Sequence, residues 1–472
     1  MRWRPRRSGI PHEHTLKSKH IDGRMEQTVE SIDVANLIET RKANWFHISI
    51  IVWACAIMAL EGYDMQVLSY AAPFIIKSWH ADRAVFGQVI GLGLVGYMLG
   101  ATLLSHLGDR FGRKRSIISG CLLFGVFTFG TAYATTLPML AGLRFVAGMG
   151  LGVSIPNTIA LAAEYSASKV RALTIGCMFI GYTLGGALGG VIAARYVSTQ
   201  GWPVLFQVGG VAPILLAAIL IFKLPESVRF LALQRDRRER VTAIVARLAP
   251  ELAISPAARF ILREERHEGL PVKRLFTDGR AMMTSLLWLA FMASLIGHYF
   301  LTSWLPTVLA GSGVSMAHAV LAGSLFQVGG GFGILIVTRF LDRRGIIAIA
   351  GTFALATPLT VLIGFAGASD VLLMAIVFLA GACVIGGQVG LNAVSGIVYP
   401  TYIRSTGAGW AFGVGRIGSI LGPVLGGFLI NKLPTSLLFT CAAIPMLCCA
   451  GAAFFLGRAP GSGAVREAPV LS

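Results

Sequence analysis

Long apolar stretches alternate with short polar turns along most of this chain. A helix of about 20 apolar residues crosses the ~30 Å hydrocarbon core of a bilayer. The sequence contains twelve such runs, at roughly residues 46–75, 86–107, 116–134, 138–160, 171–195, 203–223, 281–303, 318–340, 346–366, 371–395, 405–430 and 436–457. The pattern therefore predicts an all-α membrane protein with twelve transmembrane helices.

Two charged segments interrupt the apolar pattern and predict the domain organisation. They cover residues 1–45 and 224–280, and the second divides the twelve runs six and six. We expect a cytosolic N-terminal segment (1–45), a first six-helix bundle (46–223), a cytosolic linker of short amphipathic helices on the membrane surface (224–280), a second bundle (281–457) and a cytosolic tail (458–472). Residues 1–24 are basic and lack an apolar core, so no cleaved signal peptide is expected. Met25 opens a more ordinary helical lead-in and is an alternative start.

The composition and charge fit this class and argue against others. Hydrophobic residues make up 55% of the chain and charged residues 13%, which is unlike a soluble globular domain. With both termini in the cytosol, 34 of the 40 Lys and Arg residues fall on the cytosolic side, so the net charge of +18 is a topology signal. The same residues are divided among short loops, which disfavours nucleic-acid binding. The seven cysteines lie in apolar runs without metal-ligand spacing, so no metal, disulfide or cofactor is expected.

Glu61 and Asp64 stand inside the first apolar run, three positions apart. A charge at mid-bilayer costs about 2.5–3.5 kcal/mol on insertion scales, so such residues are rare and usually functional. At roughly 100° per residue they share one helical face, which we expect to look into the protein interior. The alternative, a charge at a helix end, fits less well because the apolar pattern continues to about residue 76.

Matching motifs in the two halves predict an internal repeat. The turn after the second run reads Gly-Asp109-Arg110-Phe-Gly-Arg113-Lys-Arg, and the turn after the eighth reads Leu-Asp342-Arg343-Arg-Gly. Spaced glycines occur in the fifth run, from Gly181 to Gly190, and in the eleventh, from Gly418 to Gly427. Two six-helix repeats imply a substrate site between the halves near the midplane, with alternating access by rocking.

On these motifs the chain resembles the major facilitator superfamily over essentially all of its membrane portion. The Asp109–Arg115 turn resembles the signature loop of that superfamily, although Ser105 stands where the first glycine is usual. Arg144 followed by spaced glycines matches the fourth-span pattern. Within the superfamily, Glu-Gly-Tyr-Asp at 61–64, Trp-Leu-Pro at 304–306 and the long stretch from Gln388 to Gly418 resemble the aromatic acid:proton symporter family. Glu61 departs from the commoner aspartate and resembles the branch that carries hydroxyphenylpropionate-type acids.

The resemblance implies proton-coupled import of a small aromatic carboxylate through the bacterial inner membrane by a protein that functions as a monomer. We expect Glu61 and Asp64 to handle protons and Arg144 to be their counter-charge. Arg416 is the candidate for the substrate carboxylate through its planar fork. The competing interpretation is that both arginines only brace helices. At 1.5 Å per residue all four groups reach the middle of the membrane, where they compensate one another.

Further candidates line the same region, each with a structural alternative. Tyr63 follows the first acid and is a candidate substrate contact. His298 could line the cavity or titrate, or be a packing histidine. Gln388 and Asn392, one turn apart, could bond a ring hydroxyl or a neighbouring helix. Trp304, at the outer end of the seventh run, is expected to be an interfacial anchor.

The turn motif implies a conformational gate. Asp109, beside Arg110 and Arg113, would form charged contacts only while the halves are closed on that face, with Asp342 and Arg343 as its weaker counterpart. Glu164 either joins this network or is a solvated loop acid. Pro423 in the eleventh run corresponds to Gly186 in the fifth. In the superfamily a proline in the fifth-span motif marks antiporters. The absence of that proline from the fifth run here favours symport. Proton-coupled efflux of small organic compounds is the alternative function, and the scattered histidines disfavour a membrane enzyme.

Overall fold

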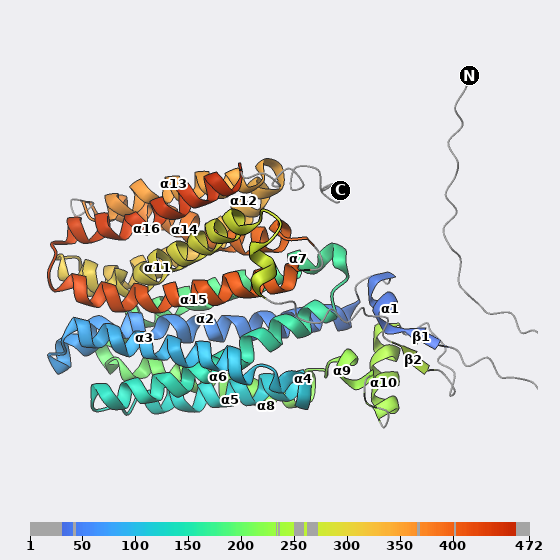
Figure 1. The fold of residues 1–472 in the computed structure, drawn as a ribbon. Helices are drawn as coiled ribbons and strands as arrows, with labels where there is room; N and C mark the ends of the chain where they lie inside the picture. The colour runs from blue at the N-terminus through green and yellow to red at the C-terminus, as the bar shows by residue number, and fades with distance from the viewer. Residues whose placement is uncertain are drawn as a thin grey trace, which may run out of the picture.

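The computed structural model describes residues 31–40, 44–232, 234, 237–249, 259–261, 272–365, 369–400 and 403–458. Residues 1–30 and 459–472, and so most of the expected N-terminal segment and tail, lie outside this range. Long helices dominate the described part (Figure 1). In the first half they are α2 (Trp45–Trp79), α3 (Arg83–Leu99), which continues as the π-helix η1 (Gly100–Leu104), α5 (Arg113–Thr131), α6 (Leu137–Glu164), α7 (Ser168–Gln200) and α8 (Pro203–Lys223).

The second half repeats this set after a central segment. Its helices are α11 (Ala281–Gly311), α12 (Met316–Arg344), α13 (Ile346–Ile363), α14 (Asp370–Val398), α15 (Arg404–Ile430) and α16 (Thr435–Leu456). Within the described ranges, eleven helices are long and apolar enough to cross a membrane. The twelfth, α5, is a transmembrane helix of 19 residues whose first turn is Arg113-Lys114-Arg115, which lowers its mean hydropathy. The prediction of twelve spans in two six-helix halves is confirmed.

Equivalent helices pack alike in the two halves, which supports the predicted repeat. α2 packs on α7 as α11 packs on α15, α3 on α6 as α12 on α14, and α5 on α8 as α13 on α16. The halves meet mainly through α7 with α12 and α3 with α15. Small residues permit the close approach, since a Cβ on Gly62 of α2 would lie 1.9 Å from the Tyr182 carbonyl oxygen of α7.

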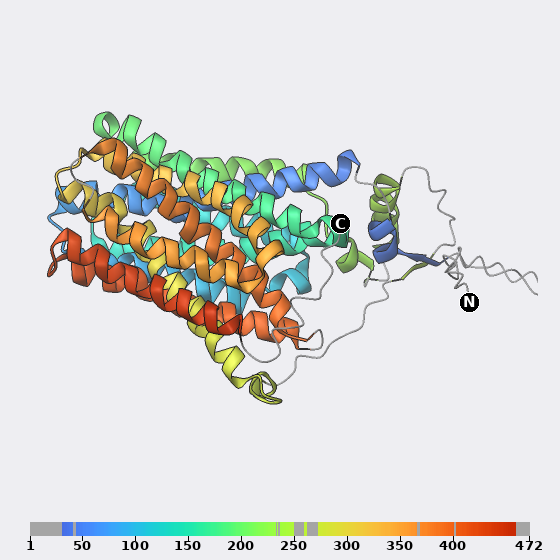
Figure 2. The ribbon, with the colours of Figure 1, turned by 90° about the horizontal axis from the view of Figure 1, so that it is seen from above.

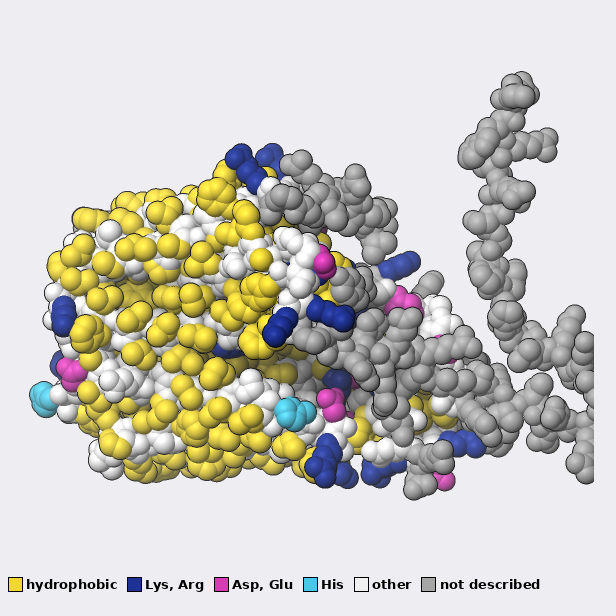
Figure 3. Space-filling model, viewed as in Figure 1, with side chains coloured by type: hydrophobic (Ala, Val, Ile, Leu, Met, Phe, Trp, Pro, Cys, Tyr) yellow, Lys and Arg dark blue, Asp and Glu magenta, His cyan; other side chains and the backbone are white. Residues whose placement is uncertain are grey.

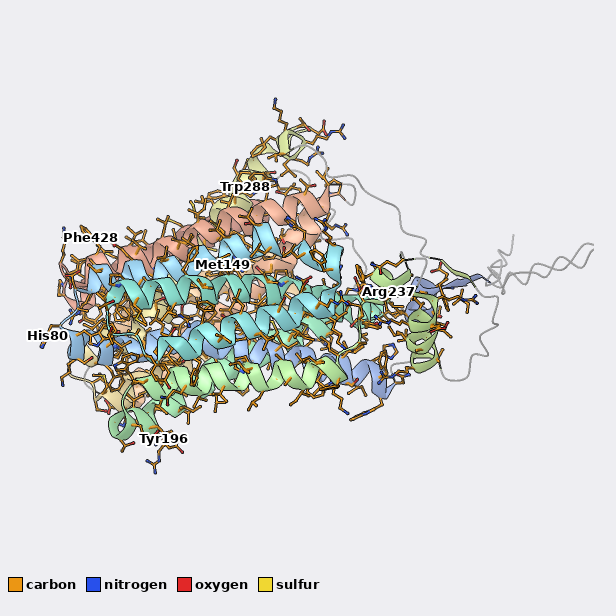
Figure 4. All side chains as sticks on the ribbon, turned by 90° about the horizontal axis from the view of Figure 1, so that it is seen from below. His80, Met149, Tyr196, Arg237, Trp288 and Phe428 are labelled. Carbon is orange, nitrogen blue, oxygen red and sulfur yellow. The ribbon has the colours of Figure 1, made fainter. Side chains whose placement is uncertain are left out.

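The short elements gather at one end of the bundle, which we call the α10 side (Figure 2). They are β1 (Ser31–Asp33), α1 (Val34–Thr40), α4 (Leu107–Phe111), α9 (Val228–Ala232), α10 (Arg238–Leu248), β2 (Arg259–Ile261) and the 3-10 helix η3 (Val272–Phe276). β1 and β2 pair in parallel, so the segment before the first half joins the central segment. The opposite end carries the loop at His80 and is called the His80 side; Figure 4 labels His80 at that end and Arg237 at the α10 side.

The central segment contains amphipathic helix α10, as predicted, but α10 does not present its apolar residues to lipid. Val241, Val245 and Leu248 are buried in one cluster with Phe46 of α2. The Asn44 amide that caps α2 also donates to the Arg247 carbonyl at 2.9 Å. The end of the first half therefore covers the apolar face of α10, and the position of the helix on the membrane surface stays a prediction.

The outer surface divides as expected of a membrane protein. Hydrophobic side chains cover the flank of the bundle, while dark-blue Lys and Arg side chains gather mostly toward the α10 side (Figure 3). Exposed large apolar residues such as Phe222 and Leu335 belong to this flank. Burying such a surface in hydrocarbon removes it from water, which makes the bundle a multi-pass membrane protein.

Candidate functional site

A cavity lies between the two halves. Helices α2, α3, α6 and α7 of the first half and α11 and α12 of the second contribute to it. Its polar and aromatic lining residues are Gln66, Ser69, Arg144, Tyr182, His298, Tyr299, Thr302, Ser303 and Gln327. Apolar walls with a few polar groups are typical of sites for small organic ligands.

Asp64 and Arg144 form a buried ion pair inside the first half. Arg144 Nη2 donates to Asp64 Oδ2 at 2.7 Å and Nη1 donates to Oδ1 at 3.1 Å. The Thr128 hydroxyl of α5 donates to Asp64 Oδ1 as well. Asp64 has 0% exposed surface and Arg144 5%. The predicted counter-charge is thus present, and the fork geometry satisfies both carboxylate oxygens.

Glu61 is equally buried, with 0% of its surface exposed, but neither carboxyl oxygen has a hydrogen-bond partner among the described residues. The carboxyl lies beside Ser154 of α6, whose hydroxyl contacts the Cys121 thiol at 3.6 Å. The expectation that both acids face the protein interior is confirmed. They differ in environment, since one carboxylate is paired and the other is not.

Arg416 of α15 reaches across the interface between the halves to a cluster of tyrosines. Its Nη2 donates to the Tyr97 hydroxyl of α3 at 2.9 Å, and the guanidinium lies 4.2 Å from the centroid of that ring. Nη1 donates to the cavity residue Tyr299 at 3.4 Å. Tyr182 belongs to the same cluster. Within the described part of the chain, no carboxylate forms an ion pair with Arg416.

The remaining candidates from the sequence are divided between the cavity and the helix interfaces. His298 lines the cavity, and its Nδ1 is buried with no partner among the described residues. Gln388 bonds instead to Ser294 of α11, which donates to it, and to Asn392, whose Oδ1 accepts at 3.0 Å. The Ser294 contact matches the neighbouring-helix alternative for Gln388, whereas the side chain of Asn392 bonds within α14.

Two aromatic candidates lie inside the bundle. Tyr63 donates to the Leu205 carbonyl of α8 at 2.9 Å and is not a cavity residue. Trp304 is wholly buried and donates to the Pro423 carbonyl at 2.8 Å. Its prediction as an interfacial anchor is wrong, because Gly427 of α15 and Gly87 of α3 leave room for the indole between the helices.

Two glutamines that the sequence analysis did not single out lie at the cavity. Gln66 comes from α2 and Gln327 from α12, and both contact Gly186 of α7. Gln327 Oε1 is buried without a hydrogen-bond partner among the described residues. The available signal was a polar side chain inside an apolar run, which is also the signal that identified Glu61 and Asp64.

The gate candidates of the first half form one network at the α10 side. Arg113 pairs with Glu164 at 2.9 Å, and Ser227 donates to the same carboxylate at 2.5 Å. Glu164 is 7% exposed, so it belongs to the network and is not a solvated loop acid. Asp109 lies 3.7 Å from Arg113, but 76% of its side chain is exposed.

The other gate candidates are more open to solvent. Arg110 is exposed beside the ring of its neighbour Phe111, and Asp342 and Arg343 are exposed at the end of α12.

Contacts between the halves close the His80 side. Ser69 of α2 donates to the Thr302 and Ser303 carbonyls of α11 at 2.6 and 2.9 Å. Beyond the cavity, Asn431 donates to Asp82 at 3.0 Å. The two halves are thus joined by direct hydrogen bonds on the His80 side.

Comparisons with known proteins agree with this architecture. Residues 54–363 match the model of the Major Facilitator Superfamily. The chain is similar to the 4-hydroxybenzoate transporter PcaK of Pseudomonas aeruginosa, with 34% identity over 85% of this chain and 90% of that protein. It is similar to the gallate transporter of Pseudomonas putida, with 35% identity over 91% and 96% of the two chains. It is also similar to the benzoate transport protein of Acinetobacter baylyi, with 30% identity over 88% and 90%.

Solved structures give the same fold. The xylose transporter XylE from E. coli superposes with a TM-score of 0.68 at 17% identity, covering 88% of this chain and 99% of that chain.

Proposed function

This chain belongs to the major facilitator superfamily, and from that membership and the site we propose that it imports an aromatic carboxylic acid in symport with protons. Its family and its relatives are transporters, not enzymes. The substrate class is hydroxybenzoate-, benzoate- or hydroxyphenylpropionate-like, as in the relatives' names. The membrane is the bacterial inner membrane, with the α10 side and both termini in the cytosol, as the distribution of Lys and Arg favours.

The Arg416 environment carries this proposal. The partly buried guanidinium of Arg416 contacts tyrosine rings and hydroxyls, and no carboxylate among the described residues pairs with its positive charge. Placing a carboxylate beside it offsets the desolvation of both groups, whereas a cationic or neutral ligand would not. The tyrosines supply flat walls for an aromatic ring. Arg416 does not itself line the cavity, but it bonds to Tyr299, which does, so an aromatic anion in the cavity would lie near its charge.

Proton coupling falls on the acids of α2. Asp64 is paired with Arg144 and accepts a hydrogen bond from Thr128 in this state. An ionised Glu61 without a partner would be costly in such an environment, so we assign the transported proton to Glu61 here. When the protein changes between its two open states, the proton leaves Glu61 or the Asp64–Arg144 pair rearranges.

The gate residues account for alternating access. The hydrogen bonds at the His80 side leave the α10 side as the route to the cavity in this state. Asp109, exposed on that side, is free to meet the second half when the bundle closes there. We assign Arg113 and Glu164 to holding the turn in place, with Asp342 and Arg343 on the opposing half.

Uptake of labelled 4-hydroxybenzoate, benzoate and 3-(3-hydroxyphenyl)propionate into membrane vesicles tests the proposal. Accumulation driven by an imposed inward proton gradient and abolished by a protonophore is the expected result. Extrusion of preloaded compounds under the same gradient would favour proton-coupled efflux. Absence of transport for every acid in the panel would refute the substrate class.

A further inference from the structure

Gln66 and Gln327, one from each half of the protein, both line the cavity and meet at Gly186 of α7. We propose that Gln327, with Gln66 beside it, binds a hydroxyl group carried on the substrate ring opposite the carboxylate. The inference rests on the proposed function and deepens it, because it makes Gln327 the residue that selects hydroxylated acids over unsubstituted ones.

The unsatisfied amide of Gln327 is the first argument. Its side chain is 2% exposed, it lines the cavity, and Oε1 has no partner among the described residues. Buried polar atoms in native proteins are nearly always hydrogen-bonded, so an unpaired carbonyl oxygen at a ligand cavity indicates a partner on the ligand. A ring hydroxyl donates a hydrogen bond, whereas a carboxylate only accepts. The free acceptor therefore fits a hydroxyl.

The packing around Gly186 is the second argument. A Cβ at this position would lie 3.1 Å from both Gln327 Nε2 and Gln66 Cγ. Glycine in α7 thus makes room for the two amide side chains to lie side by side. Nearby, the Tyr70 hydroxyl donates to the Gly186 carbonyl at 2.8 Å and holds this turn of α7 in place.

The spacing to Arg416 is the third argument. Tyr182 marks the level of the Arg416 cluster on α7, and Gly186 marks the level of the glutamines. Four residues of helix separate the two levels by about 6 Å. That is the length of a benzene ring with substituents on opposite carbons. For a substrate whose carboxylate lies at the Arg416 level, this spacing favours a 4-hydroxyl over a 2-hydroxyl as the group that meets Gln327.

Gln388 offers a matched control inside the same half. It is also a glutamine on a transmembrane helix, but its amide is already bonded to Ser294 and Asn392. Replacing it removes a polar group of the same kind without changing the cavity. It also tests the competing idea that Gln388 contacts the ring hydroxyl.

The experiment measures the affinities of benzoate, 2-hydroxybenzoate and 4-hydroxybenzoate for the purified full-length protein by ligand-induced thermal shift. A site built for a hydroxyl discriminates against the ligand that lacks it, so we expect wild type to bind 4-hydroxybenzoate at least about tenfold more tightly than benzoate. 2-Hydroxybenzoate should resemble benzoate. Gln327→Met should reduce the ratio to about one and leave benzoate affinity within about twofold, while Gln388→Met keeps the wild-type ratio.

Several outcomes would overturn the inference, and they are distinguishable from failure of the proposed function. Equal wild-type affinity for benzoate and 4-hydroxybenzoate refutes the hydroxyl contact while leaving an aromatic acid site intact. So does an unchanged ratio in Gln327→Met, or a lost ratio in Gln388→Met. The wild-type comparison needs no variant, so it decides even if Gln327→Met does not fold. If no aromatic acid binds wild type, the proposed function falls together with this inference.

Discussion

Substituting the two acids of α2 separately should give different effects on stability and the same loss of coupling. Asp64→Asn keeps the shape of the side chain but removes the negative charge that pairs with Arg144 at 2.7 Å. Breaking a buried ion pair by neutralising one partner costs about 3–5 kcal/mol, because the other charge is left buried and uncompensated. Glu61→Gln removes no hydrogen bond present in the structure. Its cost should be below about 1 kcal/mol, since glutamine resembles a protonated glutamate.

The assay has two parts. Thermal unfolding in detergent should place Asp64→Asn about 3–5 °C below wild type and leave Glu61→Gln within about 1 °C. Proteoliposomes then compare proton-driven accumulation with exchange of labelled for unlabelled substrate. Both variants should lose accumulation. Glu61→Gln should retain exchange, because a permanently neutral residue 61 mimics the loaded carrier.

The reasoning is refuted by either of two results. If Glu61→Gln is destabilised as much as Asp64→Asn, then Glu61 has a partner and is not the unpaired acid. If both variants still concentrate substrate against a gradient, the proton site lies elsewhere. The conservative Arg144→Lys variant gives a control, because it keeps the charge and loses the fork. It should fall between wild type and Asp64→Asn in stability.

Three more changes have defined outcomes. Arg416→Lys should weaken 4-hydroxybenzoate binding by about tenfold or more, and Arg416→Ala should eliminate it. Both affinities are measured by ligand-induced thermal shift. Wild-type affinity in Arg416→Ala would show that Arg416 only braces helices. Asp109→Asn should depress transport in vesicles but leave affinity unchanged, because the charge acts on the balance between states; lost affinity with normal turnover contradicts this. Gly62→Ala should lower the melting temperature or the yield of folded protein, because its Cβ would lie 1.9 Å from the Tyr182 carbonyl oxygen. Gly176→Ala, with no atom within 4 Å of its Cβ, should be neutral, and equal effects of the two would refute the packing argument.

The helices and the fold could be predicted from the sequence because both depend on local patterns. Apolar runs mark the helices to within a few residues, as in α8, where the run and the helix both cover 203–223. The repeated turn and glycine motifs identify the two halves. Charges inside apolar runs identify Asp64 and Arg144, since a membrane interior leaves a charge few alternatives to pairing.

The contacts of individual side chains could not be predicted, because they depend on how helices cross. Arg416 meets Tyr97, which is distant in the sequence and lies on the other half. Gln327 and Gln66 come together only through the packing of α12 and α2 on α7. Trp304 stands near the end of an apolar run, where an interfacial role is reasonable, and only the glycines of two other helices explain its burial.

The charges in the middle of the membrane connect the proton to the substrate. Of the two acids and two bases, Asp64 and Arg144 neutralise each other, and Glu61 and Arg416 have no partner of opposite charge among the residues that the structure describes. The Tyr97 hydroxyl accepts a hydrogen bond from Arg416. A protonated Glu61 leaves the Arg416 charge for the substrate carboxylate. An ionised Glu61 would compensate part of that charge and weaken the attraction for an anion.

Proton and substrate should therefore bind together, which is the requirement for symport. Substrate affinity should fall as pH rises, over a range of about pH 6–9 in which the aromatic acid itself stays ionised. Glu61→Gln should bind substrate with the same affinity across that range, because its charge cannot change. A wild-type affinity that is flat with pH, or a Glu61→Gln affinity that keeps the wild-type slope, would show that the proton acts through another group.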